Sequence, residues 1–218
     1  VIRAWGEHWT SQLIARGQET NLWKTDEIMN LNYAKRDGSK LTPSLVLVDS
    51  GDQTDTVYDF CADTSDYTLP AKGASRKLET DYKYSVINKA GSKACGINLV
   101  IIDTAKYKDR IAARMRRENG AGSWMVFSGI DGEYAGQVTA EHKISERQAN
   151  GAAVQKWVKK SSHGDNHYLD AEVYAMAAAD IRGARGWHLE RYEPPAKQPE
   201  APCSEEQWIQ ANELEGWL

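Results

Sequence analysis

The chain has 218 residues, of which 41% are hydrophobic and 27% charged, as in a soluble globular protein of one domain with or without a tail. No apolar run approaches the roughly 18 residues that span a bilayer, which excludes an integral membrane protein. The net charge of −4 does not suggest a nucleic-acid binder, and three separated cysteines without a CxxC pair indicate neither a disulfide framework nor a zinc ribbon.

The charges are unevenly distributed along the chain. Residues 43–71 hold six Asp and no Lys or Arg, whereas residues 72–118 hold twelve Lys or Arg and five Asp or Glu. An acidic segment beside a basic one is the pattern of a metal site next to a phosphate track. Ordinary solvated faces would give the same pattern, so this reading stays open on charge alone.

The first half of the chain predicts a hairpin followed by alternating helices and strands. We expect an antiparallel hairpin from 1–6 and 12–16, a helix over 24–35, a turn at 37–39 and a strand over 44–48 that is buried on both faces. A helix should then begin at Asp52 as N-cap and turn Val57 and Phe60 or Cys61 to the sheet. A short strand over 68–71 and a loop over 72–80 complete this half.

The second half continues the alternation, so the class is mixed α/β. The patterns predict strands over 82–88, 98–102, 123–127 and 153–158, and helices from Asp103-Thr104 onward, over 133–141, and from 165 or 166 to 181. Four prolines between 193 and 202 then indicate a polyproline-like linker, followed by a short acidic amphipathic end over 205–218. We therefore expect one domain over 1–192 and a linker and tail over 193–218.

Three carboxylates stand where ligand sites tend to lie. Asp49 and Asp103 each end a predicted strand, and Asp170 lies in the first turn of the last helix. An all-oxygen set suits Mg²⁺ or Mn²⁺, and two such ions can promote phosphodiester hydrolysis. Each residue also has a purely structural reading as a turn or helix-capping carboxylate. His163 and His167 could ligate zinc, although no third soft ligand is near.

Residues 46–61 resemble a "DSG…T..VYDF" block, and residues 166–178 resemble an "NE.LD..VYALAA" helix. Both patterns are those of the large terminase subunits of lambda-type phages, the motors that package DNA, and the chain resembles this family. Further matching blocks follow the family's order, at 4–6, 71–73, 102–106, 138–141 and 153–160. The set covers about residues 4 to 179 and belongs to the carboxy-terminal nuclease half, so it implies an RNase H-like fold, a mixed β-sheet flanked by helices.

The resemblance implies roles for individual residues. Asp49 and Asp170 would be catalytic metal ligands, with Asp103 as a further candidate, and His167 stands where the family has Glu and would assist at the metal or phosphate. The DNA-contacting cations that we expect are Lys72, Arg76, Lys77, Lys106 and Arg110. The family's first catalytic Asp lies upstream of the segment that matches 1–6, so we interpret the chain as a fragment that cuts poorly or not at all.

The sequence therefore predicts a metal-dependent endonuclease that cuts concatemeric double-stranded DNA with Mg²⁺ or Mn²⁺ in the host cytoplasm. The implied partners are DNA, the terminase ATPase domain, the small subunit and, through the carboxy-terminal tail, the capsid portal. A tail that packs back on the domain remains equally open. The alternative function is a non-catalytic RNase H-like interaction module that presents the tail to a partner.

Overall fold

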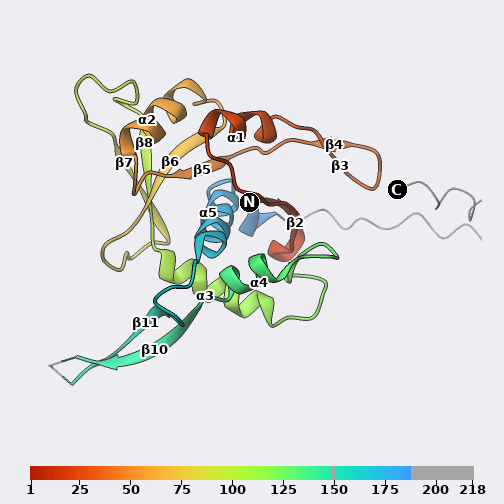
Figure 1. Cartoon of the computed structure of the whole chain (residues 1–218), viewed down its shortest axis with the longest axis vertical. Coiled ribbons are helices and arrows are strands. Elements are labelled where there is room, and N and C mark those ends of the chain that lie inside the picture. The colour runs from red at the N-terminus through yellow and green to blue at the C-terminus, as the bar shows by residue number, and fades with distance from the viewer. Residues whose placement is uncertain (149–150, 188–218) are drawn as a thin grey trace, which may run out of the picture. The chain divides into compact units, whose positions relative to one another are not determined.

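Two small β-sheets and a central helix organise the protein (Figure 1). The computed structural model describes residues 1–148 and 151–187, so the linker and tail expected over 193–218 lie outside the described residues. Strands and helices alternate along the chain, and the mixed α/β class is confirmed. None of the helices in the described ranges is long and apolar enough to cross a membrane.

The first sheet has three strands, in the order β1-β2-β9. β1 (Ile2–Trp5) pairs antiparallel with β2 (Ser11–Ala15), which confirms the predicted hairpin, and β2 pairs parallel with the short β9 (Trp124–Met125). The ring of Trp5 lies 6.1 Å from that of Trp9 and 5.6 Å from that of Trp124, measured between ring centroids. These indoles form part of the main hydrophobic core.

The second sheet has four strands, in the order β5-β6-β8-β7. β5 (Val46–Asp49), β6 (Thr68–Gly73) and β8 (Asn98–Ile102) run parallel, and β7 (Tyr82–Val86) pairs antiparallel with β8. The prediction that the apolar run at 44–48 is buried on both faces is wrong. β5 lies at the edge of this sheet with β6 as its one neighbour, and its side chains are half-buried or exposed.

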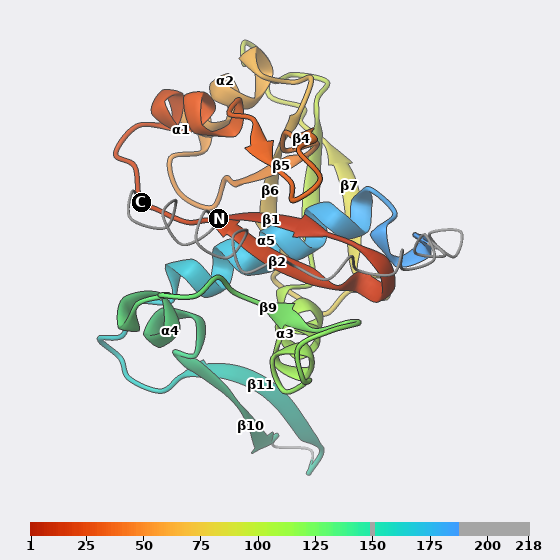
Figure 2. The same ribbon diagram turned by 90° about the vertical axis from the view of Figure 1, so that its right-hand side faces the viewer.

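In the part of the chain that the structure describes, five α-helices accompany the sheets. They are α1 (Leu22–Met29), α2 (Thr54–Asp63), α3 (Thr104–Met115), α4 (Gly132–Val138) and α5 (His167–Ile181). α5 packs against α3, α4, β1 and β5, and it lies centrally in both views (Figures 1 and 2). Nine of its fifteen residues are buried. α5 therefore touches one edge strand of each of these two sheets, β1 and β5.

Three predicted boundaries need correction. The helix expected over 24–35 ends at Met29, because the following chain forms a small hairpin of β3 (Tyr33–Ala34) and β4 (Lys40–Leu41) around Gly38. The helix expected over 133–141 ends at Val138. The N-cap of α2 is Gln53 in the left-handed region rather than Asp52, although Val57, Phe60 and Cys61 are buried as expected.

Beyond α4 the chain forms a two-stranded ribbon. β10 (Glu141–Arg147) pairs antiparallel with β11 (Ala153–Lys159), and the ribbon extends away from both sheets (Figure 1). β11 was predicted, whereas β10 was not. Lys143 and Trp157, which lie opposite each other in the ribbon, both bond to Asp109 of α3. α3 thus anchors one side of the ribbon.

Candidate active site

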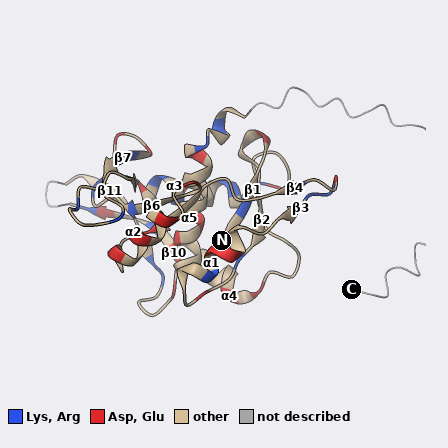
Figure 3. Cartoon of the chain, turned by 90° about the horizontal axis from the view of Figure 1, so that it is seen from above, with Lys and Arg blue, Asp and Glu red and all other residues tan. Residues whose placement is uncertain are grey.

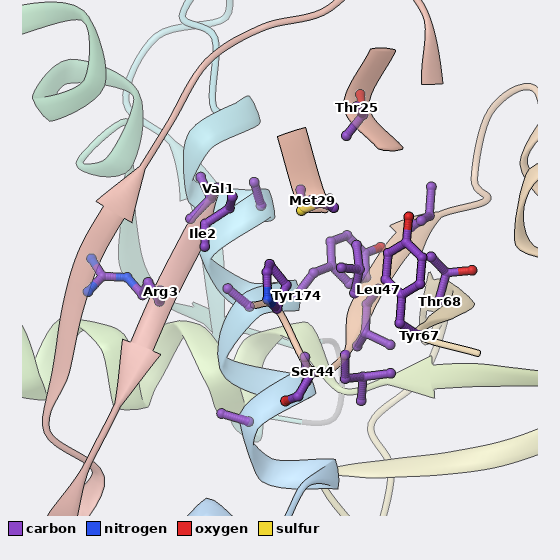
Figure 4. A pocket seen from close by; sticks show the side chains of 18 of the residues that line it. Val1, Ile2, Arg3, Thr25, Met29, Ser44, Leu47, Tyr67, Thr68 and Tyr174 are labelled. Carbon is purple, nitrogen blue, oxygen red and sulfur yellow. The ribbon is translucent and has the colours of Figure 1, made fainter. Parts of the chain in front are cut away.

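A cavity of about 430 Å³ separates the edge strands of the two sheets (Figure 4). Residues of β1 line one side and residues 43–49, including β5, line the other, while α5 and α1 supply the remaining walls. Asp49, His167 and Asp170 are all among the lining residues. The structure therefore brings the predicted strand carboxylate, helix carboxylate and histidine to one cavity, as expected for a shared site.

Asp49 ends β5 and is held by a tight turn. Its Oδ1 accepts a hydrogen bond of 3.0 Å from the backbone N–H of Gly51. A Cβ on Gly51 would lie 3.2 Å from that same oxygen, so a larger residue would crowd the carboxylate. Between them Ser50 is buried, and its hydroxyl donates to the carbonyl of Ala71 in β6 at 2.9 Å. The turn is thus fixed to the sheet while the Asp49 side chain stays exposed.

Tyr174 connects this carboxylate to α5. Its hydroxyl lies near the Asp49 carboxylate and near the backbone of Gly73 at the end of β6. Burial raises the pKa of Tyr174, and the interaction with Asp49 and the nearby charge of Asp170 raise it further. Tyr174 therefore remains a protonated donor at neutral pH. It lies one helical turn beyond Asp170, so one face of α5 presents both groups to the cavity.

Asp170 belongs to a network of polar side chains at the start of α5. Its Oδ1 lies 3.2 Å from Nζ of Lys108, and its Oδ2 accepts a hydrogen bond of 3.0 Å from Nδ2 of Asn166. Both donors also bind Glu141 at 2.8 Å. The Glu141 side chain is only 6% exposed, whereas that of Asp170 is 42% exposed. Lys108 and Asn166 thus fix the orientation of the Asp170 carboxylate, which remains partly exposed to solvent.

Sequence reasoning did not assign Glu141, Lys108 or Tyr174 to the site. Glu141 ended a recognised block at 138–141, but it was expected at the end of a helix. The i, i+4 spacing of Asn166 with Asp170, and of Asp170 with Tyr174, was a signal that could have pointed to one helix face. The contact with Lys108 joins α3 to α5 and is not visible in the sequence.

Two predicted site residues remain, His167 at the rim of the cavity and Asp103 outside it. His167 is the first residue of α5, its side chain is 79% exposed, and its Nε2 lies 3.9 Å from Asp165. Asp103 is not among the residues that line the cavity. Its carboxylate accepts backbone N–H bonds from Leu78 at 3.1 Å and Lys106 at 3.4 Å, so it caps α3 and holds the preceding loop.

The five predicted DNA contacts are among the Lys and Arg residues coloured blue in Figure 3, and they fall into two groups. Lys106 donates to three loop carbonyls, those of residues 78, 79 and 80, at 2.8–2.9 Å. Arg110 bonds to Asp81 at 2.7 Å. These two cations therefore support the loop that follows β6. The other three cations, Lys72, Arg76 and Lys77, are exposed at the end of β6 and in that loop.

The chemistry of the cavity fits a hard divalent cation only in part. Asp49 and Asp170 provide carboxylate oxygens, the ligands that Mg²⁺ and Mn²⁺ prefer, and Lys108 offsets only part of their charge. The part of the chain that the structure describes contains no group of three or more metal-ligating side chains. The described residues thus supply an incomplete ligand set.

A mixed α/β domain with two carboxylates on one cavity between its sheets is consistent with an α/β nuclease fold. A comparison with protein families identifies the family to which the chain belongs. The family model described as "Terminase large subunit gpA, endonuclease domain" matches residues 1–191, and the chain belongs to this family. No curated protein and no solved structure matched the chain.

Proposed function

We propose that this domain cuts double-stranded DNA during phage genome packaging, by divalent-metal-dependent hydrolysis of the phosphodiester backbone. The observation that carries the proposal is that Asp49 and Asp170, from elements 121 residues apart in sequence, line one cavity in a member of a terminase endonuclease family. Mg²⁺ or Mn²⁺ bound to their oxygens would supply charge neutralisation at the phosphate and activation of water.

The residues of the chain would have distinct tasks in this reaction. Asp49 and Asp170 would hold the metal, with Tyr174 and Asn166 fixing the orientation of the two carboxylates. His167, exposed at the start of α5, would assist at the scissile phosphate. Lys72, Arg76 and Lys77 would contact the DNA backbone without reading bases, because phosphate contacts carry no sequence information.

A two-metal site needs more carboxylates than these two. We place the missing ligand on an extended segment, outside the 218 residues, that occupies the cavity between β1 and β5. Among the described residues each of these strands has one hydrogen-bonded neighbour, and residues of both line the cavity, so each has an unpaired backbone edge to offer to such a segment. This placement agrees with the family resemblance, which puts a first catalytic Asp before the segment matching 1–6. In the packaging motor, located in the host cytoplasm, the remaining partners would be the ATPase domain, the small subunit and, through the tail, the portal.

A plasmid-nicking assay in Mn²⁺ tests the proposal. The 218-residue chain should cut slowly or not at all, and a version extended upstream should cut. In the extended protein Asp49→Asn and Asp170→Asn should each abolish cutting, while Asp59→Asn, which removes an exposed carboxylate from α2, should not. Undiminished cutting by both site variants would refute the assignment and favour a non-catalytic module.

A further inference from the structure

A second hollow, of about 490 Å³, lies between α3 and the β10–β11 ribbon. Its apolar base includes Ile111, Val138 and Leu169, which are buried in the domain. Charged side chains and one indole from α3 and the ribbon form its rim. We call this hollow the ribbon groove. The function proposed for the first cavity assigns no role to the ribbon groove.

The ribbon groove carries an excess of unsatisfied positive charge. Its two carboxylates are already paired, Asp109 with Lys143 at 2.7 Å and Glu141 with Lys108 at 2.8 Å. Within residues 1–148 and 151–187, Arg116 bonds only to a carbonyl of its own helix, and the side chains of His142 and Lys160 make no hydrogen bond or ion pair. The charges of Arg116 and Lys160 are therefore free to meet an anionic ligand, and the His142 ring adds a polar group beside them.

The groove also offers an aromatic and a thioether surface. Trp157 is half-buried, and its Nε1 donates to Oδ1 of Asp109 at 2.9 Å, which fixes the indole at the groove. Met115, on the α3 side, is 37% exposed. Cations beside a fixed aromatic ring are the arrangement that binds single-stranded nucleic acid, where phosphates meet the charges and an unpaired base stacks on the ring.

We propose that the ribbon groove binds a short single-stranded segment of nucleic acid, which in a terminase is one strand of the DNA substrate. A duplex keeps its bases paired and stacked, so it presents no free base face to Trp157. The groove also adjoins the catalytic cavity, since Lys108 contacts Glu141 in the groove and Asp170 in the cavity. The identity of the ligand as DNA rests on the proposed function, whereas its single-stranded character rests on the groove.

Equilibrium binding without metal tests the groove separately from cleavage. Fluorescence anisotropy of a labelled oligothymidine should be measured in EDTA over a range of salt concentrations, for the wild type and for the double variant Arg116→Glu/Lys160→Glu. Removing two phosphate contacts should lower the slope of log K against log salt by about 1.4, since each contact contributes about 0.7 on a single strand. The matched control is Arg36→Glu/Lys40→Glu, which makes the same charge change at exposed positions of the β3–β4 hairpin and should leave the slope nearly unchanged.

Substitution of the indole separates stacking from charge. Trp157→Ala should weaken binding about 5- to 100-fold, the range for loss of one stacked base, and Trp157→Phe should restore most of the affinity because the ring returns without its bond to Asp109. Equal weakening by both pairs of charge variants, or tighter binding of a duplex than of the single strand, would overturn the proposal. Binding that persists in an upstream-extended protein that fails to cut DNA in Mn²⁺ would refute the nuclease assignment while leaving the groove intact.

Discussion

Replacing Arg3 with Met should nearly unfold the domain, and a second substitution should rescue it. Arg3 and Glu172 form a fully buried ion pair that joins β1 to α5, with both side chains at 0% exposure. The guanidinium also donates to Ser11 at 3.1 Å and lies 3.6 Å from the centroid of the Trp124 ring. Tyr134 donates to the same carboxylate. The pair therefore fixes the strand that lines one side of the candidate cavity against the helix that carries Asp170.

The expected loss of stability follows from the burial of the Arg3–Glu172 ion pair. Arg3→Met leaves the Glu172 carboxylate buried without its counter-charge, which costs about 3–5 kcal/mol, a large fraction of the roughly 5–15 kcal/mol that stabilises a typical domain. Glu172→Met should cost a similar amount for the converse reason. In Arg3→Met/Glu172→Met both charges are gone, and the remaining cost is about 1–3 kcal/mol because the Tyr134 hydroxyl loses its bonds.

Urea unfolding followed by circular dichroism measures these differences as shifts of the midpoint at constant slope. The double variant should be several kcal/mol more stable than the sum of the two single losses would allow. Additive losses would show that the two groups contribute independently, and the argument from an uncompensated buried charge would be refuted.

Three further predictions concern the loop and the site. Lys106→Met removes three bonds to loop carbonyls and should speed amide exchange over 74–81 without unfolding the domain, measured by hydrogen-exchange mass spectrometry. Asp81 has a lowered pKa because bonds to two arginines outweigh its burial, so its contribution to stability is present above about pH 4 and lost as the pH falls further. Asp81→Asn should therefore destabilise the protein at pH 7 and flatten the acid limb of a stability–pH curve; an unchanged acid limb would contradict this. Tyr174→Phe should raise the Mn²⁺ concentration needed for half-maximal cutting by the extended protein, because Asp49 loses its orienting donor; a changed maximal rate at unchanged Mn²⁺ dependence would argue against a positioning role.

Local patterns predicted most elements because their physical causes are local. The strand at 98–102 and the helix that begins at Asp103 appear with the expected boundaries, since a β-rich apolar run and an N-cap carboxylate act over a few residues. β10 was missed because its alternation of charged and polar residues carries no apolar face, and its partner strand alone determines its conformation. The half-burial of β5 was also beyond the sequence, since edge or centre is a property of the sheet.

The candidate site shows the same division. Asp49 and Asp170 were predicted from their positions at a strand end and a helix start and from the family resemblance, and the structure places both on one cavity, while their role as metal ligands stays a prediction. The partners of Asp170 come from α3 and β10, and no spacing rule connects those segments. Lys106 was expected near DNA phosphates because of its charge and of the family resemblance at 102–106, whereas in the structure its ammonium donates to loop carbonyls. Charge identifies candidates, while hydrogen-bond partners decide which of them remain available.

The late position of α5 in the chain affects how the cavity forms during synthesis. α5 touches β1 and β5, one edge strand of each sheet, yet its residue Asp170 is made 121 residues after Asp49. At roughly 5–20 residues per second, about 6–24 s pass on the ribosome before Asp170 follows Asp49. During that interval α5 is missing from between β1 and β5, so neither the complete cavity nor its pair of carboxylates exists. The nascent chain consequently cannot assemble this acidic site until nearly the whole domain has been translated.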